Sequence, residues 1–123
     1  MNDIFVWKNG EKLAQKYLKK NGYKILSTNE KNQFAEVDII AEKNNEIIFI
    51  EVKSRTNLEY GTPGEAVTIK KQQAYIRFSQ QYVVKNKIAD KNLRFDVIEI
   101  LNGEINHIIS AFDADCMKIY ISK

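Results

Sequence analysis

Cysteine, histidine and proline are nearly absent from this chain, since each occurs once in 123 residues. A lone Cys116 cannot form an internal disulfide, and with a lone His107 it excludes a zinc site built from cysteine and histidine. No apolar run approaches the roughly 20 residues that cross a bilayer. The first residues also lack the basic stretch and apolar core of a signal peptide. These absences predict a protein of the reducing cytoplasm with no membrane partner.

Neither sign of charge dominates, because 19 Lys and Arg residues stand against 16 Asp and Glu residues, for a net charge of +3. This mild basic excess fits a polyanionic partner without requiring one. Hydrophobic residues make up 44% and charged residues 28%, which is the balance of a folded globular protein. The length suits one hydrophobic core, and no repeat or linker marks a boundary. We therefore expect residues 1–123 to form a single domain.

The N-terminal segment, residues 3–20, has helical character. Trp7, Ala14 and Leu18 recur at the spacing of one helical face, and Gly22 follows where a left-handed C-terminal cap is expected. Gly10 costs a helix interior about 1 kcal/mol relative to alanine. Its presence therefore predicts a kink or a close approach of another element.

A second helix is predicted to end near Lys85. It has two rival starts, a capping box at residues 62–65 with proline at the first helical position, and Thr68. The sequence does not choose between them. Three apolar residues share one face at helical spacing: Ile69, Ile76 and Val83.

Short β-rich segments occupy most of the remaining chain. The predicted strands are residues 23–28, 36–41, 46–53, 93–101 and 104–112. Lys43-Asn44-Asn45 and Asn102-Gly103 have the composition of hairpin turns. The tail to Lys123 is undecided, although Ile119 and Ile121 alternate as in an edge strand. The order of elements predicts an α/β fold, with a mixed sheet of about five strands flanked by an N-terminal helix and a central helix.

The first predicted hairpin brings charged residues together. If its turn is centred between residues 44 and 45, Asp38 faces Glu51 with Cβ atoms roughly 5 Å apart. Alternation along the strand places Lys53 on the same face as Glu51. Two opposed carboxylates destabilise a sheet unless a positive charge offsets them. A divalent cation would do so, and hard oxygen ligands select Mg²⁺ or Mn²⁺.

Apolar neighbours surround each of these acids, a setting in which carboxylates are rare unless paired or bound to metal. Glu11 likewise interrupts the apolar stripe of the first helix. We therefore predict Asp38 and Glu51 as metal ligands, with Glu11 completing the shell or holding a water. Lys53 would lie near the attacking water or the scissile phosphate of a phosphodiester.

Further polar side chains are candidates for sequence-independent, salt-sensitive contacts with a nucleic-acid backbone. They are Arg55, Lys70, Lys71, Gln73 and Arg77.

At these residues the chain resembles known nucleases. Asp38, twelve intervening residues and then Glu51-Val52-Lys53 resemble the Asp…(Asp/Glu)-x-Lys signature of restriction-endonuclease-like enzymes. More narrowly, the chain resembles the YraN family of small bacterial proteins over about nine-tenths of its length. Segments that carry the resemblance include Gly10-Glu11, residues 36–41, residues 49–53, Glu65-Ala66-Val67, Lys71 and residues 94–97. The chain departs from the family at Lys31 and Ala35, where arginine and glycine are usual.

The resemblance implies a restriction-endonuclease-like core and a metal-dependent endonuclease acting on nucleic acid, with DNA as the expected substrate. No motif for reading a base sequence is present, so recognition of branched or otherwise shaped nucleic acid is expected. A homodimer would supply the two sites needed to cut both strands, although no segment marks an interface. In related nuclease folds a polar residue of the central helix supports the active site, and Lys71 matches the family's lysine.

Other interpretations stay open. The protein would be a non-catalytic nucleic-acid-binding module if it kept the fold without turnover, or an interaction protein with no nucleic-acid partner. The Asp38, Glu51 and Lys53 cluster would then be a structural ion pair. Glu11 would be an exposed residue on a rotated helix face, and Lys71 and Gln73 would be solvated.

Several residues are interpreted as structural. Asp96 is expected to pair with Arg94 or Lys53, and His107 to be a satisfied strand residue rather than a ligand. Glu36 is either a solvated strand end or a neighbour of the metal, and Glu65 is expected to serve a capping box. Three aromatic residues of the second helix are expected to pack against the core: Tyr75, Phe78 and Tyr82.

Overall fold

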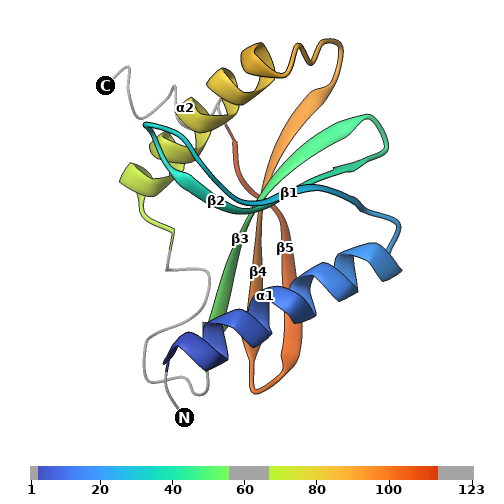
Figure 1. Cartoon of the computed structure of the whole chain (residues 1–123), viewed down its shortest axis with the longest axis vertical. Helices are drawn as coiled ribbons and strands as arrows, with labels where there is room; N and C mark the ends of the chain where they lie inside the picture. The colour runs from blue at the N-terminus through green and yellow to red at the C-terminus, as the bar shows by residue number, and fades with distance from the viewer. Residues whose placement is uncertain (1–2, 56–66, 114–123) are drawn as a thin grey trace.

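The computed structural model of this chain describes residues 3–55 and 67–113, with the side chains of residues 10–54 and 67–113. The described residues form two helices and five strands (Figure 1). In chain order they are α1 (Asp3–Lys20), β1 (Lys24–Lys31), β2 (Glu36–Lys43), β3 (Glu46–Arg55), α2 (Ile69–Lys85), β4 (Asn92–Leu101) and β5 (Glu104–Phe112). The predicted α/β class, with helices at the N-terminus and in the middle, is confirmed.

The five strands lie in the sheet in their chain order. β3 and β4 are parallel, and the other neighbouring strands are antiparallel, so the sheet is mixed as predicted. A parallel pair cannot be joined by a tight turn and requires a crossover. That crossover contains α2, and β3 is the central strand of the sheet.

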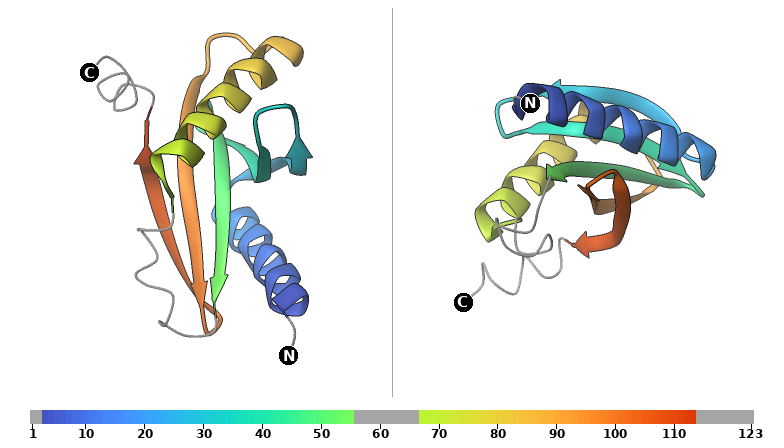
Figure 2. Two further views of the ribbon diagram at one scale, coloured as in Figure 1. Left: turned by 90° about the vertical axis from the view of Figure 1, so that its left-hand side faces the viewer. Right: turned by 90° about the horizontal axis from the view of Figure 1, so that it is seen from below.

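The two helices cover opposite faces of the sheet (Figure 2). Alternation along β3 sends Ile47 and Phe49 to the α2 face, and Ile48 and Ile50 to the α1 face. All four are buried, which explains the continuous apolar run of this strand.

The two halves of the core differ in composition. On the α2 face the rings are stacked, with centroids 5.6 Å apart for Phe49 and Phe95 and 5.1 Å apart for Phe95 and Phe112. On the α1 face the core is mainly aliphatic and includes Leu18 and Ile39. No helix among the described residues is both long and apolar enough to cross a membrane.

The ends of most elements agree with the sequence predictions. α1 has the predicted bounds, and Gly22 follows it with φ +86°. α2 begins after Thr68, whose hydroxyl accepts a hydrogen bond from the Lys71 amide, so the structure selects this start. Residues 62–65, the rival start that includes Glu65, lie outside the described residues, as do Cys116 and the tail from residue 114.

Two predictions need correction. β1 continues to Lys31 rather than ending at residue 28, because these residues pair with the start of β2. Ile69 does not belong to the packing face of α2 and is 43% exposed. The helix instead packs through Tyr75, Phe78 and Tyr82, whose rings contact Phe49 or Phe112 on the sheet. The expectation that these three are packing residues is confirmed.

Candidate active site

The hairpin of β2 and β3 has the predicted register, but it ends before the candidate site. Asn44 and Asn45 form its turn, with φ of 50° and 65°, as a two-residue hairpin of this kind requires. Pairing then continues from Lys43 opposite Glu46 to Ile39 opposite Ile50. The next two residues, Asp38 and Glu51, are not paired in the ladder. The prediction that they are cross-strand partners is therefore wrong.

Asp38 takes a different role at this point. Its Oδ2 atom accepts a hydrogen bond of 2.8 Å from the backbone amide of Val52. In a continued antiparallel ladder this amide would donate to the backbone of β2. The carboxylate of Asp38 therefore replaces a backbone acceptor at the place where β2 leaves the central strand.

Glu51 projects from β3 toward α2 and is 4% exposed. Its Oε1 atom forms an ion pair with Lys71 of α2, and the Nζ atom of Lys53 lies 3.7 Å from the same oxygen. Its Oε2 atom is buried and has no hydrogen-bond partner within the described part of the chain. Because an unsatisfied buried carboxylate oxygen is costly, Glu51 retains the capacity to bind one more cation or donor.

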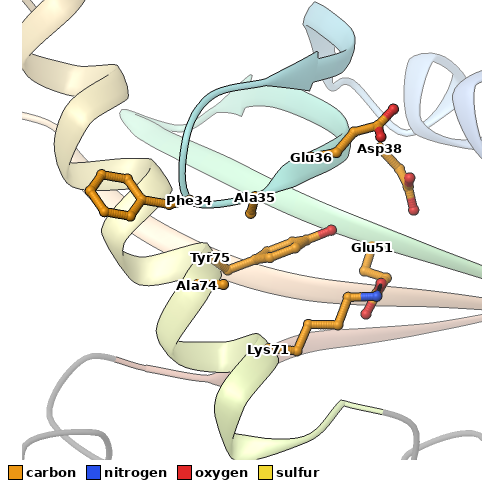
Figure 3. A pocket seen from close by; sticks show the side chains of 8 residues that line it. All are labelled: Phe34, Ala35, Glu36, Asp38, Glu51, Lys71, Ala74 and Tyr75. Carbon is orange, nitrogen blue, oxygen red and sulfur yellow. Dashed lines mark ion pairs between the residues drawn. The ribbon is translucent and has the colours of Figure 1, made fainter.

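A pocket of about 480 Å³ opens beside these residues (Figure 3). Its described lining residues are Phe34, Ala35, Glu36, Asp38, Glu51, Lys71, Ala74 and Tyr75. They come from β2 and the loop before it, from β3, and from the first turns of α2. In Figure 3 the acids Asp38 and Glu51 lie with Lys71 at one end, and Phe34 lies at the other.

Two side chains that line the pocket, Asp38 and Tyr75, have raised pKa values. Burial raises the pKa of Asp38 to about 6, and the nearby Glu51 carboxylate adds to this rise, although the Val52 amide, Lys71 and Lys53 oppose it. Burial, followed by the charges of Glu51 and Asp38, raises the pKa of Tyr75. The Tyr75 hydroxyl therefore stays protonated at neutral pH. The site combines the carboxylates of Glu36, Asp38 and Glu51 with two ammonium groups and one phenol.

Glu11 approaches the same region from the other side of the sheet. It is 6% exposed and lies on the buried face of α1 with Ala14 and Leu18, as the helical spacing predicted. Its Oε1 atom has no hydrogen-bond partner among the described residues. Burial raises the pKa of Glu11 to about 7, with smaller contributions from the charges of Asp38 and Glu36.

Gly10 explains how α1 comes so close to the sheet. A Cβ atom at this position would lie 2.6 Å from both Cβ and Oγ of Ser54 on β3. The predicted close approach is therefore confirmed, and it places the next residue, Glu11, against the sheet.

The three predicted metal ligands are not gathered into one group. Within residues 3–55 and 67–113, no set of three or more His, Cys, Asp or Glu side chains is arranged to hold a metal ion. Glu11 does not belong to the described pocket lining, whereas Asp38 and Glu51 do. Mg²⁺ in phosphoryl-transfer sites is commonly held by one or two carboxylates together with phosphate oxygens and water. Asp38 and Glu51 supply two such carboxylates, and the Oε2 atom of Glu51 has no hydrogen-bond partner among the described residues, so the two residues fit that requirement.

The residues predicted to contact a nucleic-acid backbone lie at different distances from the pocket. Lys71 lines the pocket, whereas Lys70 and Arg77 are exposed on α2 and Gln73 is half-buried, and these three are not among the described lining residues. Arg55 ends β3, and its side chain lies outside the described part of the structure. Of the four members whose side chains the structure describes, Lys71 alone is brought to the carboxylates.

Comparison with known proteins identifies the family. The model of the Uncharacterised protein family UPF0102 matches residues 10–100. The chain belongs to this family. The match covers the elements that carry Glu11, Asp38, Glu51 and Lys71. UPF0102 is the same family as the YraN family that the sequence resembles.

UPF0102 proteins from several bacteria are similar to this chain over nearly their whole length. The protein of Persephonella marina is 44% identical over 115 residues, which cover 91% of this chain and 99% of that protein. The protein of Alkaliphilus oremlandii is 50% identical over 109 residues, covering 84% and 93%. That of Clostridioides difficile is 47% identical over 105 residues, covering 84% and 92%. These names describe a family and no activity.

A second cluster of buried polar residues in this UPF0102 chain is structural. Asp96 is fully buried, and it accepts hydrogen bonds of 2.9 and 2.7 Å from Arg94, 2.7 Å from His107 Nε2 and 3.0 Å from the Ser110 amide. Burial alone would raise the pKa of Asp96, but the bonds from His107, Arg94 and Ser110 lower it. Tyr17 lies 2.9 Å from His107 Nδ1. Arg94 is one of the two predicted partners of Asp96, and His107 is a satisfied strand residue as expected.

Four lining residues were not assigned to the site from the sequence: Phe34, Ala35, Ala74 and Tyr75. Tyr75 lies four positions after Lys71 and so shares its helix face, a signal that was available in the sequence. Phe34 sits in a short turn between β1 and β2, and nothing local in the sequence indicates that it lines a pocket.

Proposed function

We propose that this UPF0102 protein is a nuclease of restriction-endonuclease-like fold that hydrolyses phosphodiester bonds of DNA with Mg²⁺ or Mn²⁺. One observation supports the proposal most strongly. Glu51 and Asp38 meet in a pocket at the place where β2 leaves the central strand, and a buried oxygen of Glu51 has no partner among the described residues. A fold does not gain stability from such an arrangement, whereas a metal site requires it.

The proposed metal ligands are Asp38 and Glu51. A divalent ion supplies an activated water and neutralises charge on the phosphate when it is bound. Glu11, buried behind Asp38, would accept a hydrogen bond from a water at the site. Burial is the main cause of the raised pKa values of Glu11 and Asp38, and a divalent ion bound beside these groups would lower both.

The two lysines have separate roles in this proposal. Lys71 neutralises Glu51 when no metal ion is present. If a divalent ion were bound to Glu51, the Lys71 ammonium would be available to bind a phosphate oxygen. Lys53 is 24% exposed on the same strand face and would stabilise the negative charge that develops on the phosphate.

A nuclease assay with matched variants tests the proposal. Branched, flapped, single-stranded and duplex DNA, and RNA, are incubated with Mg²⁺ or Mn²⁺. We expect wild-type cleavage, its loss in Glu51→Gln, and full activity in Glu104→Gln, which changes an exposed glutamate of β5. Lys53→Met should lower the rate by about 100- to 1,000-fold. Lys85→Met, at an exposed lysine in the last turn of α2, is its control.

The outcomes separate the alternatives. Binding without cleavage of any substrate would favour the nucleic-acid-binding module. Cleavage that survives Glu51→Gln would place the activity at another site or in a contaminant. Calorimetry should show Mn²⁺ binding in wild type and its loss in Glu51→Gln. No Mn²⁺ binding in the presence of nucleic acid would overturn the metal assignment.

A further inference from the structure

The pocket has two ends of different chemistry. One end carries the charges of Glu36, Asp38, Glu51 and Lys71, and the other is formed by the apolar side chains of Phe34, Ala35 and Ala74 (Figure 3). The ring of Tyr75 lies between these ends. With a divalent ion at the acids, as the proposed function has it, a ligand that satisfies both ends joins an anionic group to a flat apolar group.

Phe34 differs from the aromatic residues of the core. Its side chain is 37% exposed, whereas Phe49 and Phe78 are fully buried and Tyr75 is 2% exposed. Ala35 packs against the α2-face core, and Phe34 is not part of that cluster. The ring is therefore presented at the rim of the pocket without a role in the core.

The turn that carries Phe34 is held in place by Asn32. The Oδ1 atom of Asn32 accepts hydrogen bonds from the amides of Phe34 at 2.8 Å and Ala35 at 3.3 Å. The backbone amide of Asn32 donates a hydrogen bond of 3.0 Å to the Ala35 carbonyl. The side-chain Nδ2 atom of Asn32 donates a long hydrogen bond of 3.5 Å to the Phe78 carbonyl of α2. This bonding attaches the turn to both β2 and α2, and so sets the position of the exposed ring.

We propose that Phe34 is a stacking platform for one unpaired base of a nucleic-acid strand whose phosphate lies at the charged end of the pocket. A nucleotide joins a planar base to an anionic phosphate, which is the combination that the two ends require. A base inside a continuous duplex is covered on both faces by its neighbours, so only an unstacked base can lie on Phe34. The substrate class is therefore nucleic acid with single-stranded nucleotides at gaps, flaps or ends. The position of the phosphate rests on the proposed function, whereas the stacking does not.

Binding measurements test the platform separately from cleavage. The probes are a gapped duplex with 2-aminopurine in the gap and a fully paired duplex of the same sequence, with Ca²⁺ in the buffer. We expect wild type to bind the gapped probe more tightly and to quench its fluorescence by stacking. Phe34→Leu keeps an apolar side chain without an aromatic face. It should bind the gapped probe about 5- to 150-fold more weakly, as loss of one base stack predicts, and should not quench it.

Two further variants control this experiment. Phe34→Trp retains an aromatic face and should retain both the gap preference and the quenching. Gln33→Ala changes the exposed neighbour of Phe34 in the same turn and should behave as wild type. Because the Phe34 ring lies outside the core cluster, the melting temperature of Phe34→Leu should match that of wild type.

The failures of the two proposals are distinguishable. If Phe34→Leu binds and quenches the gapped probe as wild type does, or if wild type binds neither probe, the stacking proposal is overturned. If Phe34 controls gap binding but no metal supports cleavage, the stacking proposal stands and the nuclease proposal fails. If Glu51-dependent cleavage occurs and Phe34→Leu leaves gap binding unchanged, the nuclease proposal stands and the stacking proposal fails.

Discussion

The same kind of residue, a buried acid on the sheet, serves two purposes in this protein. Asp96 receives hydrogen bonds from Arg94, His107 and Ser110, and both of its oxygens are engaged. Glu51 has one oxygen paired with Lys71 and the other without a partner among the described residues. Satisfaction of both oxygens indicates a structural role for Asp96, and the unpartnered oxygen indicates a binding role for Glu51.

This difference predicts stability losses of different size for substitutions at Asp96 and Glu51. Asp96→Asn should lower the free energy of unfolding by about 3–5 kcal/mol, because it removes the fully buried charge that pairs with Arg94, which then keeps its ion pair with Glu46. Glu51→Gln should cost less than about 1 kcal/mol, because Lys71 and Lys53 are partly exposed and can turn to water. Urea denaturation of the metal-free protein measures both. Equal losses in the two variants would mean that Glu51 belongs to a structural ion pair.

At the scale of single residues, the sequence indicated the acids better than their partners. Glu11, Asp38 and Glu51 stand out because a carboxylate in an apolar stripe is unusual. The contact of Lys71 with Glu51 joins a helix and a strand through a pocket, so a local pattern could raise Lys71 as a candidate but could not assign its partner. Phe34 gave no signal because its role depends on where the turn lies above α2.

At the scale of elements, the approach of α1 to β3 depends on the absence of a side chain at Gly10. Alanine there would improve helix propensity by about 1 kcal/mol, but its Cβ atom would meet Ser54 at 2.6 Å. The Oγ atom of Ser54 can rotate away, but its Cβ atom cannot move without the strand. Overpacking of this kind costs about 1–3 kcal/mol.

We expect Gly10→Ala to destabilise the protein and to displace Glu11 from the sheet. Ser54→Gly removes both atoms that the new methyl group would meet, so the double variant should recover stability relative to the sum of the single variants. Urea denaturation of the two single variants and the double variant measures this coupling. Additive losses would show that the contact with Ser54 does not limit the position of α1.

At the scale of the whole molecule, the sheet is covered by helices on both faces, and the candidate site lies where β2 leaves β3. The site draws on α1, β2, β3 and α2. Its acids are therefore shielded from water by the fold as a whole, and their ionisation is coupled to folding.

This coupling predicts how stability depends on pH. The pKa values of Glu11 and Asp38 rise from 4.5 and 3.8 to about 7 and about 6 on folding. A carboxyl group with a raised pKa stabilises the fold fully below its unfolded pKa and loses that contribution as pH rises through its folded pKa. The metal-free protein should therefore become less stable between pH 5 and 8. The lowered pKa of Asp96 acts only below about 4, outside this window.

Melting temperatures at pH 5 and pH 8 in EDTA check this prediction. Glu11→Gln cannot ionise, so its melting temperature should fall less than that of wild type. Addition of Mn²⁺ at pH 8 should raise the wild-type value, because a ligand of the folded state stabilises it. A wild-type melting temperature that rises from pH 5 to 8, with the same change in Glu11→Gln, would contradict the prediction.

The sequence by itself determined the elements of this protein and its unusual acids. Helix caps, turn residues and alternation act within a few positions, so the ends of α1 and β5 and the register set by Asn44 and Asn45 followed from local patterns. Only the tertiary structure decided that the ladder stops before Asp38, that Lys71 pairs with Glu51, and that Phe34 stands at the rim of the pocket. The last two features join α2 to the hairpin of β2 and β3, and no local interaction in the chain specifies such distances.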